Sequence, residues 1–333
     1  MTILVTGSAG FIGSHFVTDW VASSSEKVIS IDNLSHSVSL DFIKSLSNSH
    51  LHHFFEGDIN DHLFLETLFN EHKPRAVVHF AADTHVDRSI SNPESFIQSN
   101  IIGTFRLLEI IRFFNQNNQT KCLLLHVSTD EVFGSLNQTT LFSEDALYSP
   151  NNPYSASKAA SDHLVKAWHK TFEIPFLMAH TCNNFGPRQH IEKLIPLIIT
   201  SAFKSEILPI YGDGQHEREW LFVNDHCEAL RLVLDRGEVG ETYNIGSGIV
   251  LKNIHLVEKI CDVLDEIYPK KNKTSYREQI KFIKDRPGHD RAYRMDSTKI
   301  KQSLGWTAQH NFEEALYTTV KWYLEVFKSP VNL

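Results

Sequence analysis

Tyr154 and Lys158 lie four residues apart in a segment whose apolar pattern predicts a helix over 153–172. Side chains at this spacing share one face of a helix, about one turn apart. A free phenol has a pKa of about 10, and a nearby ammonium group lowers that pKa by stabilising the phenolate. The pair can therefore act as a base toward a hydroxyl group. The alternative is an amphipathic surface helix, which explains most pairs with this spacing.

Two adjacent acids, Asp130 and Glu131, follow the apolar run 122–127 and Thr129. Neighbouring strand residues point to opposite faces, so the two acids must lie on a turn beyond the strand, where Gly134 can bend the chain. Two carboxyl groups can have pKa values that their surroundings drive apart, so that one donates a proton while the other removes one. A solvated loop is the alternative, because Asp and Glu are mostly surface residues.

A glycine-rich turn near the beginning of the chain has the spacing of a dinucleotide-binding motif. Gly7, Gly10 and Gly13 follow a short apolar run and open a helical pattern. Glycine lets the backbone approach a pyrophosphate, whose charge is favoured at a helix N-terminus. Asp32 ends the next apolar run, where a carboxylate accepts hydrogen bonds from ribose hydroxyls and repels a 2′-phosphate. The motif predicts NAD rather than NADP, and a tight turn without a ligand is the alternative.

Short apolar runs alternate with helical patterns through the first half of the chain. The runs lie at 3–5, 28–31, 53–55, 76–80, 122–127 and 176–179, and the helical patterns at 11–21, 62–71, 95–115 and 153–172. This alternation predicts an α/β fold with a Rossmann-type doubly wound parallel sheet, whose ligands bind at the carboxyl ends of the strands. We expect an NAD-binding domain over 1–182, to which 220–246 returns. A smaller mixed α/β C-terminal substrate lobe is expected over 183–219 and 247–333.

The composition of the 333 residues argues against several classes of function. A net charge of -8 disfavours nucleic-acid binding and adsorption to membranes. No apolar stretch reaches the roughly 20 residues that cross a bilayer, and the first strand follows the initial Met without a signal-peptide pattern, so we expect a cytoplasmic protein. The four cysteines form no metal-binding pair and the 19 histidines show no ligand spacing. We therefore predict no metal site.

The glycine turn, the Thr129–Asp130–Glu131 stretch and the Tyr154–Lys158 pair together resemble the extended short-chain dehydrogenase/reductase family. Over nearly the whole chain the sequence is similar to one branch of that family, the dTDP-glucose 4,6-dehydratases. The stretches that carry this similarity lie at 80–90, 183–196, 211–226 and 286–291. The resemblance implies an NAD-dependent hydro-lyase that converts dTDP-glucose to dTDP-4-keto-6-deoxyglucose, a precursor of deoxysugars such as rhamnose.

The resemblance also implies a separate catalytic role for each of these residues. Tyr154, assisted by Thr129 and Lys158, would oxidise C4 together with NAD. Glu131 would then remove the C5 proton, and Asp130 would protonate the departing C6 hydroxyl. The hydride would return to C6, so NAD is regenerated within one turnover and should stay tightly bound.

Further contacts are assigned from the resemblance alone. Cofactor contacts are expected at Gly7, Gly10, Phe11, Ile12, Gly13, Asp32, Asn33, Asp58, Ile59, Phe80, Ala81, Ala82, Ser99, Tyr154, Lys158 and Asn184. Substrate contacts are expected at Thr84, Thr129, Asn183, Lys193, Leu194, Pro209, Tyr211, Arg218, Asn253, Arg286, His289 and Asp290. Lys193, Arg218 and Arg286 would converge on the diphosphate and offset the acidic net charge locally.

The sequence departs from the usual pattern of the family at a few positions. Asp83 and Thr84 stand where Glu-Ser is common, and Phe133 and Phe185 stand where tyrosine is frequent. The stretch 33–39 also differs, which leaves the contacts to adenosine open. None of these changes removes an expected catalytic residue.

Alternative functions stay open from the sequence. A UDP-glucose 4,6-dehydratase would differ in substrate by one methyl group, which is worth only about 1–3 kcal/mol in a pocket. A nucleotide-sugar C4 epimerase would not need the two acids, and a non-catalytic NAD-sensing protein would need none of the five catalytic residues.

The family usually forms homodimers through helices of the sheet domain. The resemblance therefore implies a homodimer whose interface is formed by the helices at 99–115 and 154–170. Burial within one subunit explains the apolar positions of these helices nearly as well. Those positions are Leu107, Ile111, Phe114, Ala160, Leu164 and Trp168.

Overall fold

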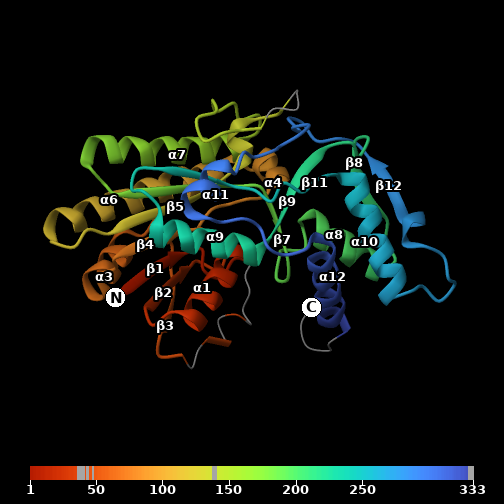
Figure 1. Ribbon diagram of the computed structural model, residues 1–333, viewed down its shortest axis with the longest axis horizontal. Helices are drawn as coiled ribbons and strands as arrows, with labels where there is room; N and C mark the ends of the chain where they lie inside the picture. Colours follow the sequence, from red (N-terminus) through yellow and green to blue (C-terminus); the bar gives the residue numbers. More distant parts are fainter. Residues whose placement is uncertain (36–41, 43–44, 47–48, 137–140, 329–333) are drawn as a thin grey trace.

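The computed structural model describes residues 1–333 except 36–41, 43–44, 47–48, 137–140 and 329–333. Residues 36–39, which belong to the stretch that departs from the family, lie outside the described residues. Figure 1 shows a larger part built around a sheet and, beside it, a smaller part that contains α8, α10 and α12.

The central sheet has seven strands among the described residues, in the order β10-β6-β5-β4-β1-β2-β3. Its strands are β1 (Thr2–Thr6), β2 (Lys27–Asp32), β3 (His52–Glu56), β4 (Ala76–His79), β5 (Leu123–Thr129), β6 (Phe176–Thr181) and β10 (Thr242–Ile245). Neighbouring strands pair in parallel throughout. The predicted doubly wound parallel sheet is confirmed.

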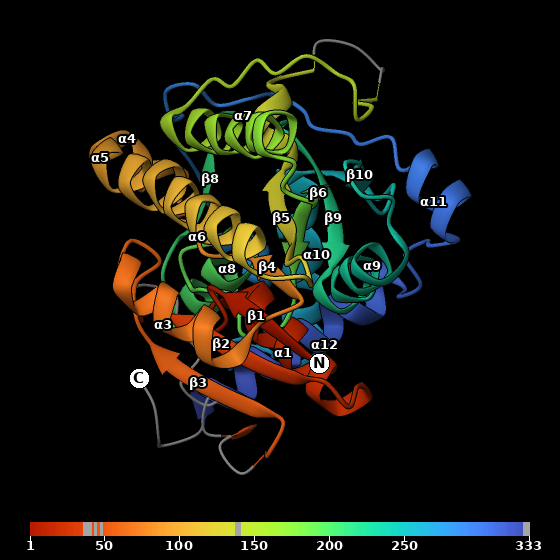
Figure 2. The same ribbon diagram turned by 90° about the vertical axis from the view of Figure 1, so that its left-hand side faces the viewer.

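Helices cover both faces of this sheet, as the two views show (Figure 2). α1 (Phe11–Ser23) packs beside α9 (Val223–Arg236), and α3 (His62–His72), α6 (Gly103–Asn117) and α7 (Pro153–Phe172) lie on the opposite face. In β1, Ile3 and Val5 belong to one apolar core and Leu4 to the other. A strand buried on both faces reads as a continuous apolar run, which is why these short runs were recognisable in the sequence.

The stretch 95–115 is helical as predicted, but it is not one regular α-helix. The chain forms α4 (Val86–Ser91), α5 (Pro93–Phe96) and a π-helical segment, η1 (Ile97–Ile102), before α6 begins. A π-helical turn inserts an extra residue into the helix, and such turns are frequent at functional sites. The apolar pattern did not reveal the insertion because the flanking α-helices keep their own periodicity.

The smaller part is a mixed α/β lobe. β7 (Asn183–Phe185), β9 (Glu217–Phe222) and β11 (Val250–Lys252) form one sheet, and β8 (Leu208–Tyr211) pairs with β12 (Ile280–Ile283). Its helices include α8 (Leu194–Phe203), α10 (Asn253–Ile267) and α12 (Phe312–Lys328), with the short η3 (Tyr276–Gln279). α11 (Thr298–Leu304) packs near β10. Of the stretch 220–246, β10 joins the central sheet while β9 does not, and the domain boundaries stay a prediction.

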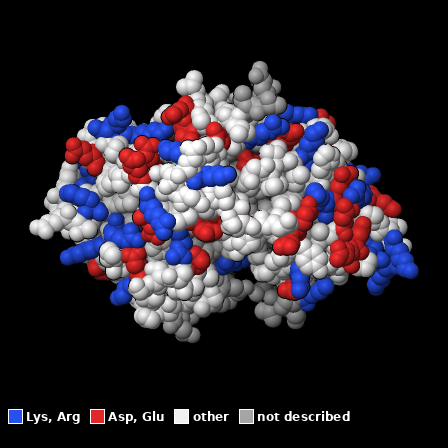
Figure 3. Space-filling model, viewed as in Figure 1, with Lys and Arg blue, Asp and Glu red and all other residues white. Residues whose placement is uncertain are grey.

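On the face shown in Figure 3, acidic and basic side chains are interspersed and do not separate into one broad basic surface. None of the described helices is long and apolar enough to cross a membrane.

Candidate active site

A cavity of about 750 Å³ opens at the carboxyl ends of the central strands. Its walls include the glycine turn after β1, Asp32 at the end of β2 and the acids after β5. Asn183 and Lys193, from the smaller lobe, line the cavity as well. Ligands of doubly wound sheets bind at this edge, so the cavity lies where the strand pattern predicts a site.

The glycine turn is shaped by close backbone contacts. Gly7 has φ +66°, and a Cβ atom there would lie 2.6 Å from the Ala81 backbone nitrogen. A Cβ atom at Gly13 would lie 2.2 Å from the Gly7 carbonyl oxygen. Gly10 is the N-cap of α1, with no side chain over the helix N-terminus. The turn thus leaves backbone N–H groups free to face an anionic group such as a pyrophosphate.

Asp32 is held at the cavity wall by the backbone. Its Oδ2 accepts a hydrogen bond from the Ala9 N–H at 2.9 Å, and its Oδ1 accepts one from the Leu34 N–H at 2.9 Å. Burial raises the pKa of this carboxyl, and the backbone donors oppose the rise. Each carboxylate oxygen can accept more than one hydrogen bond, so both remain able to accept ribose hydroxyls.

The two acids lie on a turn directly after β5, as the alternation of strand side chains required. Residues Asp130–Phe133 form a 3-10 turn, η2, whose N-cap Thr129 accepts a hydrogen bond from the Glu131 N–H. Gly134 ends the turn at φ +76°, and a Cβ atom there would lie 2.2 Å from the Ser149 carbonyl oxygen. The turn brings the acids into the cavity beside Tyr154.

The surroundings of the acid pair (Asp130 and Glu131) differ. Burial, with the neighbouring Glu131 and Glu219 carboxylates, raises the pKa of Asp130 well above its usual range. Asp130 Oδ2 is buried and has no partner among the described residues, as suits a protonated carboxyl. Burial also raises the pKa of Glu131, but the charges of Arg218, Lys193 and Arg286 oppose it. Asp130 is therefore the acid that carries a proton at neutral pH, which it can give to a leaving group.

The effect of Lys158 on Tyr154 stays a prediction, because other groups dominate the pKa of this phenol in the protein alone. Burial, followed by the Glu131 charge, raises the pKa of Tyr154 above its ordinary value, although hydrogen bonding to Thr129 opposes this. Lys158 Nζ donates to the Val127 carbonyl oxygen at 2.9 Å. Burial lowers the pKa of this ammonium group, and Asp162 opposes the change. The spacing placed the two side chains correctly on α7 but could not reveal the burial that dominates the pKa of Tyr154.

A buried polar cluster under Lys158 was missed from the sequence. Asp162 accepts a hydrogen bond from the Ser128 hydroxyl at 2.9 Å and from the Tyr148 hydroxyl at 3.0 Å. The His126 and His180 rings lie 3.0 and 3.1 Å from its two oxygens. Burial opposes ionisation, but these hydrogen bonds hold the pKa of Asp162 well below its usual range. One indication of this cluster was present in the sequence: Asp162 lies four residues after Lys158, on the same face of the predicted helix.

Asn100, on the π-helical segment, was also missed. Its Nδ2 donates to the Asp83 carbonyl oxygen at 3.0 Å and to the Ser157 hydroxyl at 2.8 Å. Its Oδ1 accepts from the Asp83 N–H at 2.8 Å. Asn100 thereby ties the loop that carries Thr84 to α7, the helix that carries Tyr154.

All five expected catalytic residues and all the expected cofactor residues line the cavity. The cofactor set comprises Gly7, Gly10, Phe11, Ile12, Gly13, Asp32, Asn33, Asp58, Ile59, Phe80, Ala81, Ala82, Ser99, Tyr154, Lys158 and Asn184. Of the expected substrate residues, the cavity walls include Thr84, Thr129, Asn183 and Lys193. Lys193 Nζ donates to the Thr84 carbonyl oxygen at 2.7 Å.

The other expected substrate residues do not line this cavity, and their roles stay predictions. They are Leu194, Pro209, Tyr211, Arg218, Asn253, Arg286, His289 and Asp290. The Arg286 guanidinium lies 4.8 Å from the centre of the Tyr211 ring and 3.6 Å from Asp87. The Asp290 carboxylate accepts hydrogen bonds from Asn151, just before α7, and from Tyr293, so its two oxygens tie this loop to the larger part.

The chain matches the family model described as GDP-mannose 4,6 dehydratase over residues 4–319. It belongs to this family. Among curated members, it is 48% identical over 327 residues to a dTDP-glucose 4,6-dehydratase of Xanthomonas campestris pv. campestris (strain B100), covering 97% of this chain and 93% of that one. It is 45% identical to the dTDP-glucose 4,6-dehydratase of Salmonella typhimurium (strain LT2), at the same coverage. The predicted family resemblance is confirmed.

Solved structures of the dehydratase family and of its epimerase relatives share this fold. DesIV, a dTDP-glucose 4,6-dehydratase from Streptomyces venezuelae with NAD bound, has a TM-score of 0.90 and 38% identity, covering 98% of this chain and 97% of that one. A UDP-glucose 4-epimerase from Thermotoga maritima has a TM-score of 0.86 and 27% identity, covering 98% and 100%. The fold alone therefore does not distinguish a dehydratase from an epimerase. The residues of the site have to distinguish them.

Proposed function

We propose that this chain catalyses the NAD-dependent dehydration of dTDP-glucose to dTDP-4-keto-6-deoxyglucose. Its full-length similarity to dTDP-glucose 4,6-dehydratases supports the substrate. The observation that carries the chemistry is the acid pair, placed beside Tyr154 with the pKa of Asp130 raised more strongly than that of Glu131.

The residues fit NAD at several independent points. The glycine turn leaves no room for side chains over the N-terminus of α1, Asp32 fixes a carboxylate for ribose hydroxyls, and the cavity reaches from there to Tyr154. NAD, if bound here, would supply a hydride acceptor and donor and the positive charge of its oxidised nicotinamide ring. Lys158 is buried at the cavity wall, and its charge together with that of the ring would favour the phenolate form of Tyr154.

The protein residues move the protons. Tyr154 takes the proton of the C4 hydroxyl, with Thr129 hydrogen-bonded to the same oxygen. The resulting C4 ketone acidifies the C5 hydrogen, which Glu131 removes as a proton. Asp130 gives its proton to the C6 hydroxyl, so that water leaves and a C5–C6 double bond forms. Protonation at C5 after hydride return completes the 4-keto-6-deoxy sugar.

The binding of the nucleotide diphosphate falls to the smaller lobe. The charges of Arg218, Lys193 and Arg286 oppose the rise in the pKa of Glu131, and that of Arg218 also opposes the rise at Asp130. We propose that they offset the diphosphate charge and that Asn183, Leu194, Pro209, Tyr211 and Asn253 help to hold the sugar, ribose and base. The roles of His289 and Asp290 toward the substrate stay predictions from the resemblance.

A C4 epimerase on the same fold would gain nothing from a protonated acid beside its sugar. Asp130 is almost wholly buried and its Oδ2 has no partner among the described residues, which costs free energy. The acid pair thus favours elimination of water over epimerisation, and it equally disfavours a protein that only senses NAD.

We also propose a homodimer formed through α6 and α7. Leu107, Ile111 and Phe114 are buried in the subunit's own core and give no support to this interface. Phe113 and Phe172 support it, because they are 47% and 41% exposed on these neighbouring helices. Light scattering after gel filtration should report twice the mass of one chain.

We also propose a cytoplasmic location. The four free cysteines support it, because free cysteines are typical of reducing compartments.

The test is turnover of the purified protein with dTDP-glucose and, in parallel, UDP-glucose. The 4-keto-6-deoxy product is recognised by its absorbance in alkali. We expect turnover of dTDP-glucose without added NAD, because the cofactor is regenerated within each cycle and stays bound. A preference for UDP-glucose would keep the mechanism and change the nucleotide. Binding of NAD with no turnover of either sugar would refute the proposal.

A further inference from the structure

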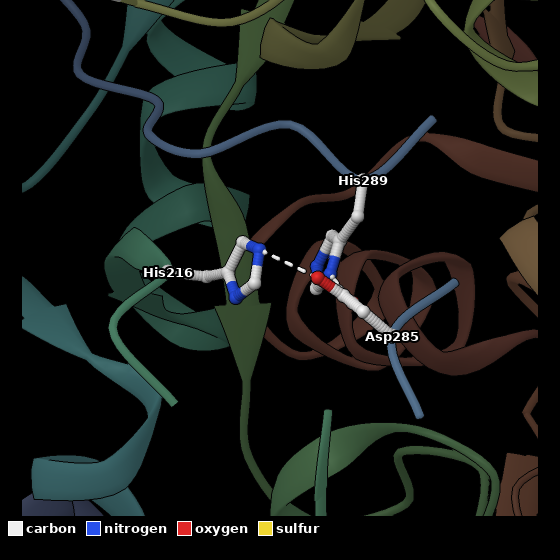
Figure 4. Close-up of side chains that lie close together, drawn as sticks. All are labelled: His216, Asp285 and His289. Carbon is white, nitrogen blue, oxygen red and sulfur yellow. Dashed lines mark hydrogen bonds and ion pairs between the residues drawn. The ribbon is translucent and has the colours of Figure 1, made fainter. Parts of the chain in front are cut away.

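Three side chains from two loops of the smaller lobe point toward one another (Figure 4). His216 precedes β9, and Asp285 and His289 follow β12. The ligand atoms of the three groups all lie within 4.8 Å of one another. His289 Nδ1 is 2.6 Å from Asp285 Oδ1, and His216 Nε2 is 3.3 Å from Asp285 Oδ2. The two imidazole rings are stacked, with centroids 3.7 Å apart.

The cluster is closed on the histidine side and open on the carboxylate side. The side chains of His216 and His289 are 4% and 6% exposed, whereas that of Asp285 is 39% exposed. Gly212 allows the carboxylate this close approach, since a Cβ atom there would lie 2.8 Å from Asp285 Oδ2. A small ion can therefore reach the three groups past Asp285.

Two imidazole nitrogens and one carboxylate oxygen are the ligand atoms that this cluster offers. Histidine nitrogens and carboxylate oxygens are among the usual protein ligands of zinc.

The spacing is also close to what a tetrahedral ion needs. Bonds of about 2.0–2.1 Å to nitrogen and oxygen place neighbouring ligands of a tetrahedral zinc ion about 3.3 Å apart. The His216–Asp285 distance of 3.3 Å has this value already, whereas the His289–Asp285 distance of 2.6 Å must open slightly. The stacked imidazole rings must also turn, so that both nitrogen lone pairs face the ion. Imidazole nitrogens select ions such as Zn²⁺ and Co²⁺ over Ca²⁺ and Mg²⁺, which take oxygen ligands.

We propose that His216, Asp285 and His289 form a site for one divalent transition-metal ion of the zinc class, with a water molecule as the fourth ligand. Three protein ligands leave one open position, as in many zinc sites that are not purely structural. The proposal does not depend on the dehydratase reaction, because none of the steps above uses a metal ion.

The surrounding charges tune the expected affinity. Arg286 and Arg218 act on His289, and Arg291 acts on His216, so these positive charges work against a cation. Their effect is reduced because Asp213 pairs with Arg291 at 2.8 Å and Asp87 lies 3.6 Å from Arg286. We therefore expect weaker binding than at the closed four-ligand sites of structural zinc proteins.

The first test is metal binding to the full-length protein after treatment with a chelator. Co²⁺ serves as the probe, because a tetrahedral cobalt site absorbs visible light far more strongly than an octahedral one. We expect one equivalent of Co²⁺ to give the strong spectrum and one equivalent of Zn²⁺ to remove it. His216→Gln and Asp285→Asn should each abolish the strong spectrum. His310→Gln is the matched control, because His310 Nδ1 lies 2.7 Å from Asp225 in a second histidine–carboxylate pair.

The second test is the effect of Zn²⁺ on thermal unfolding. An ion that binds only the folded state raises the unfolding temperature. We expect a rise for the wild type and His310→Gln, and none for the folded His216→Gln or Asp285→Asn. Binding that is not stoichiometric, a weak octahedral cobalt spectrum, or equal binding by His216→Gln and wild type would overturn the proposal. Any of these results would leave the turnover of dTDP-glucose, and hence the proposed function, untouched.

Discussion

His226 predicts a specific loss of stability in mild acid. It lies on α9 with no exposed surface, and neither ring nitrogen has a partner among the described residues. Burial lowers its pKa from 6.5 to about 3. The unfolded chain therefore takes up a proton at this residue below pH 6.5, whereas the folded protein does not until about pH 3. Stability from this group is full above pH 6.5 and is lost as the pH falls through that window.

The loss in the free energy of unfolding depends on how far the pH lies below the pKa of His226 in the unfolded chain. Each pH unit below 6.5 costs about 1.4 kcal/mol, so the free energy of unfolding should fall by about 2 kcal/mol between about pH 7.5 and pH 5. This figure hardly depends on the folded pKa, because at pH 5 the folded imidazole is almost entirely neutral for any value near 3.

The assay compares wild type with His226→Leu, a side chain of similar volume that cannot titrate. Urea unfolding is followed by tryptophan fluorescence at several pH values, and the difference between the two proteins cancels the contributions of the other histidines. We expect wild type to lose about 2 kcal/mol more than the variant over this range. Parallel stability curves for the two proteins would refute the reasoning that His226 stays neutral in the folded state.

Three further substitutions test how the site is built. Gly134→Ala places a Cβ atom 2.2 Å from a carbonyl oxygen at φ +76°, and thermal unfolding should show a loss of at least about 1–3 kcal/mol. Asp32→Ala removes the carboxylate that repels a 2′-phosphate, so the ratio of NAD to NADP affinity, measured by fluorescence titration, should fall; an unchanged ratio would contradict that role. Asn100→Ala frees the loop carrying Thr84 from α7, which should lower kcat for dTDP-glucose while NAD stays bound; an unchanged kcat would make Asn100 structural only.

The parts of the site that the sequence predicted are those carried by local chemistry. Gly7 and Gly13 are fixed by backbone contacts within one strand–turn–helix unit, and Asp32 ends the neighbouring strand. Tyr154 and Lys158 share a helix face by spacing alone. Each of these features depends on residues close in the chain or on the regular geometry of an α/β unit, which a single sequence contains.

The parts that were missed depend on contacts across the chain. The π-helical turn at Ile97–Ile102 is an irregularity of the backbone hydrogen bonds, and the strand Ile280–Ile283 is too short to show a clear period. The raised pKa of Tyr154 comes from burial and from acids on another element. His216 and His289 come together only because two loops of the smaller lobe meet. Spacing along the sequence carries no signal for such contacts.

The most direct test of the central claim is the reaction of the acid pair in D₂O. Wild type should form a 4-keto-6-deoxy product that carries deuterium at C5, because the C5 proton is removed and later replaced from solvent. Glu131→Gln and Asp130→Asn should each lower the rate of product formation by about 10²-fold or more, the usual contribution of a general acid or base. Glu192→Gln is the control, since Glu192 lines the same cavity but pairs with Arg88.

Product formation by Glu131→Gln at close to the wild-type rate, with deuterium still entering C5, would contradict the assignment of Glu131 as the base. The account predicts instead that Glu131→Gln forms almost no product while NAD remains bound and Glu192→Gln turns over at nearly the wild-type rate.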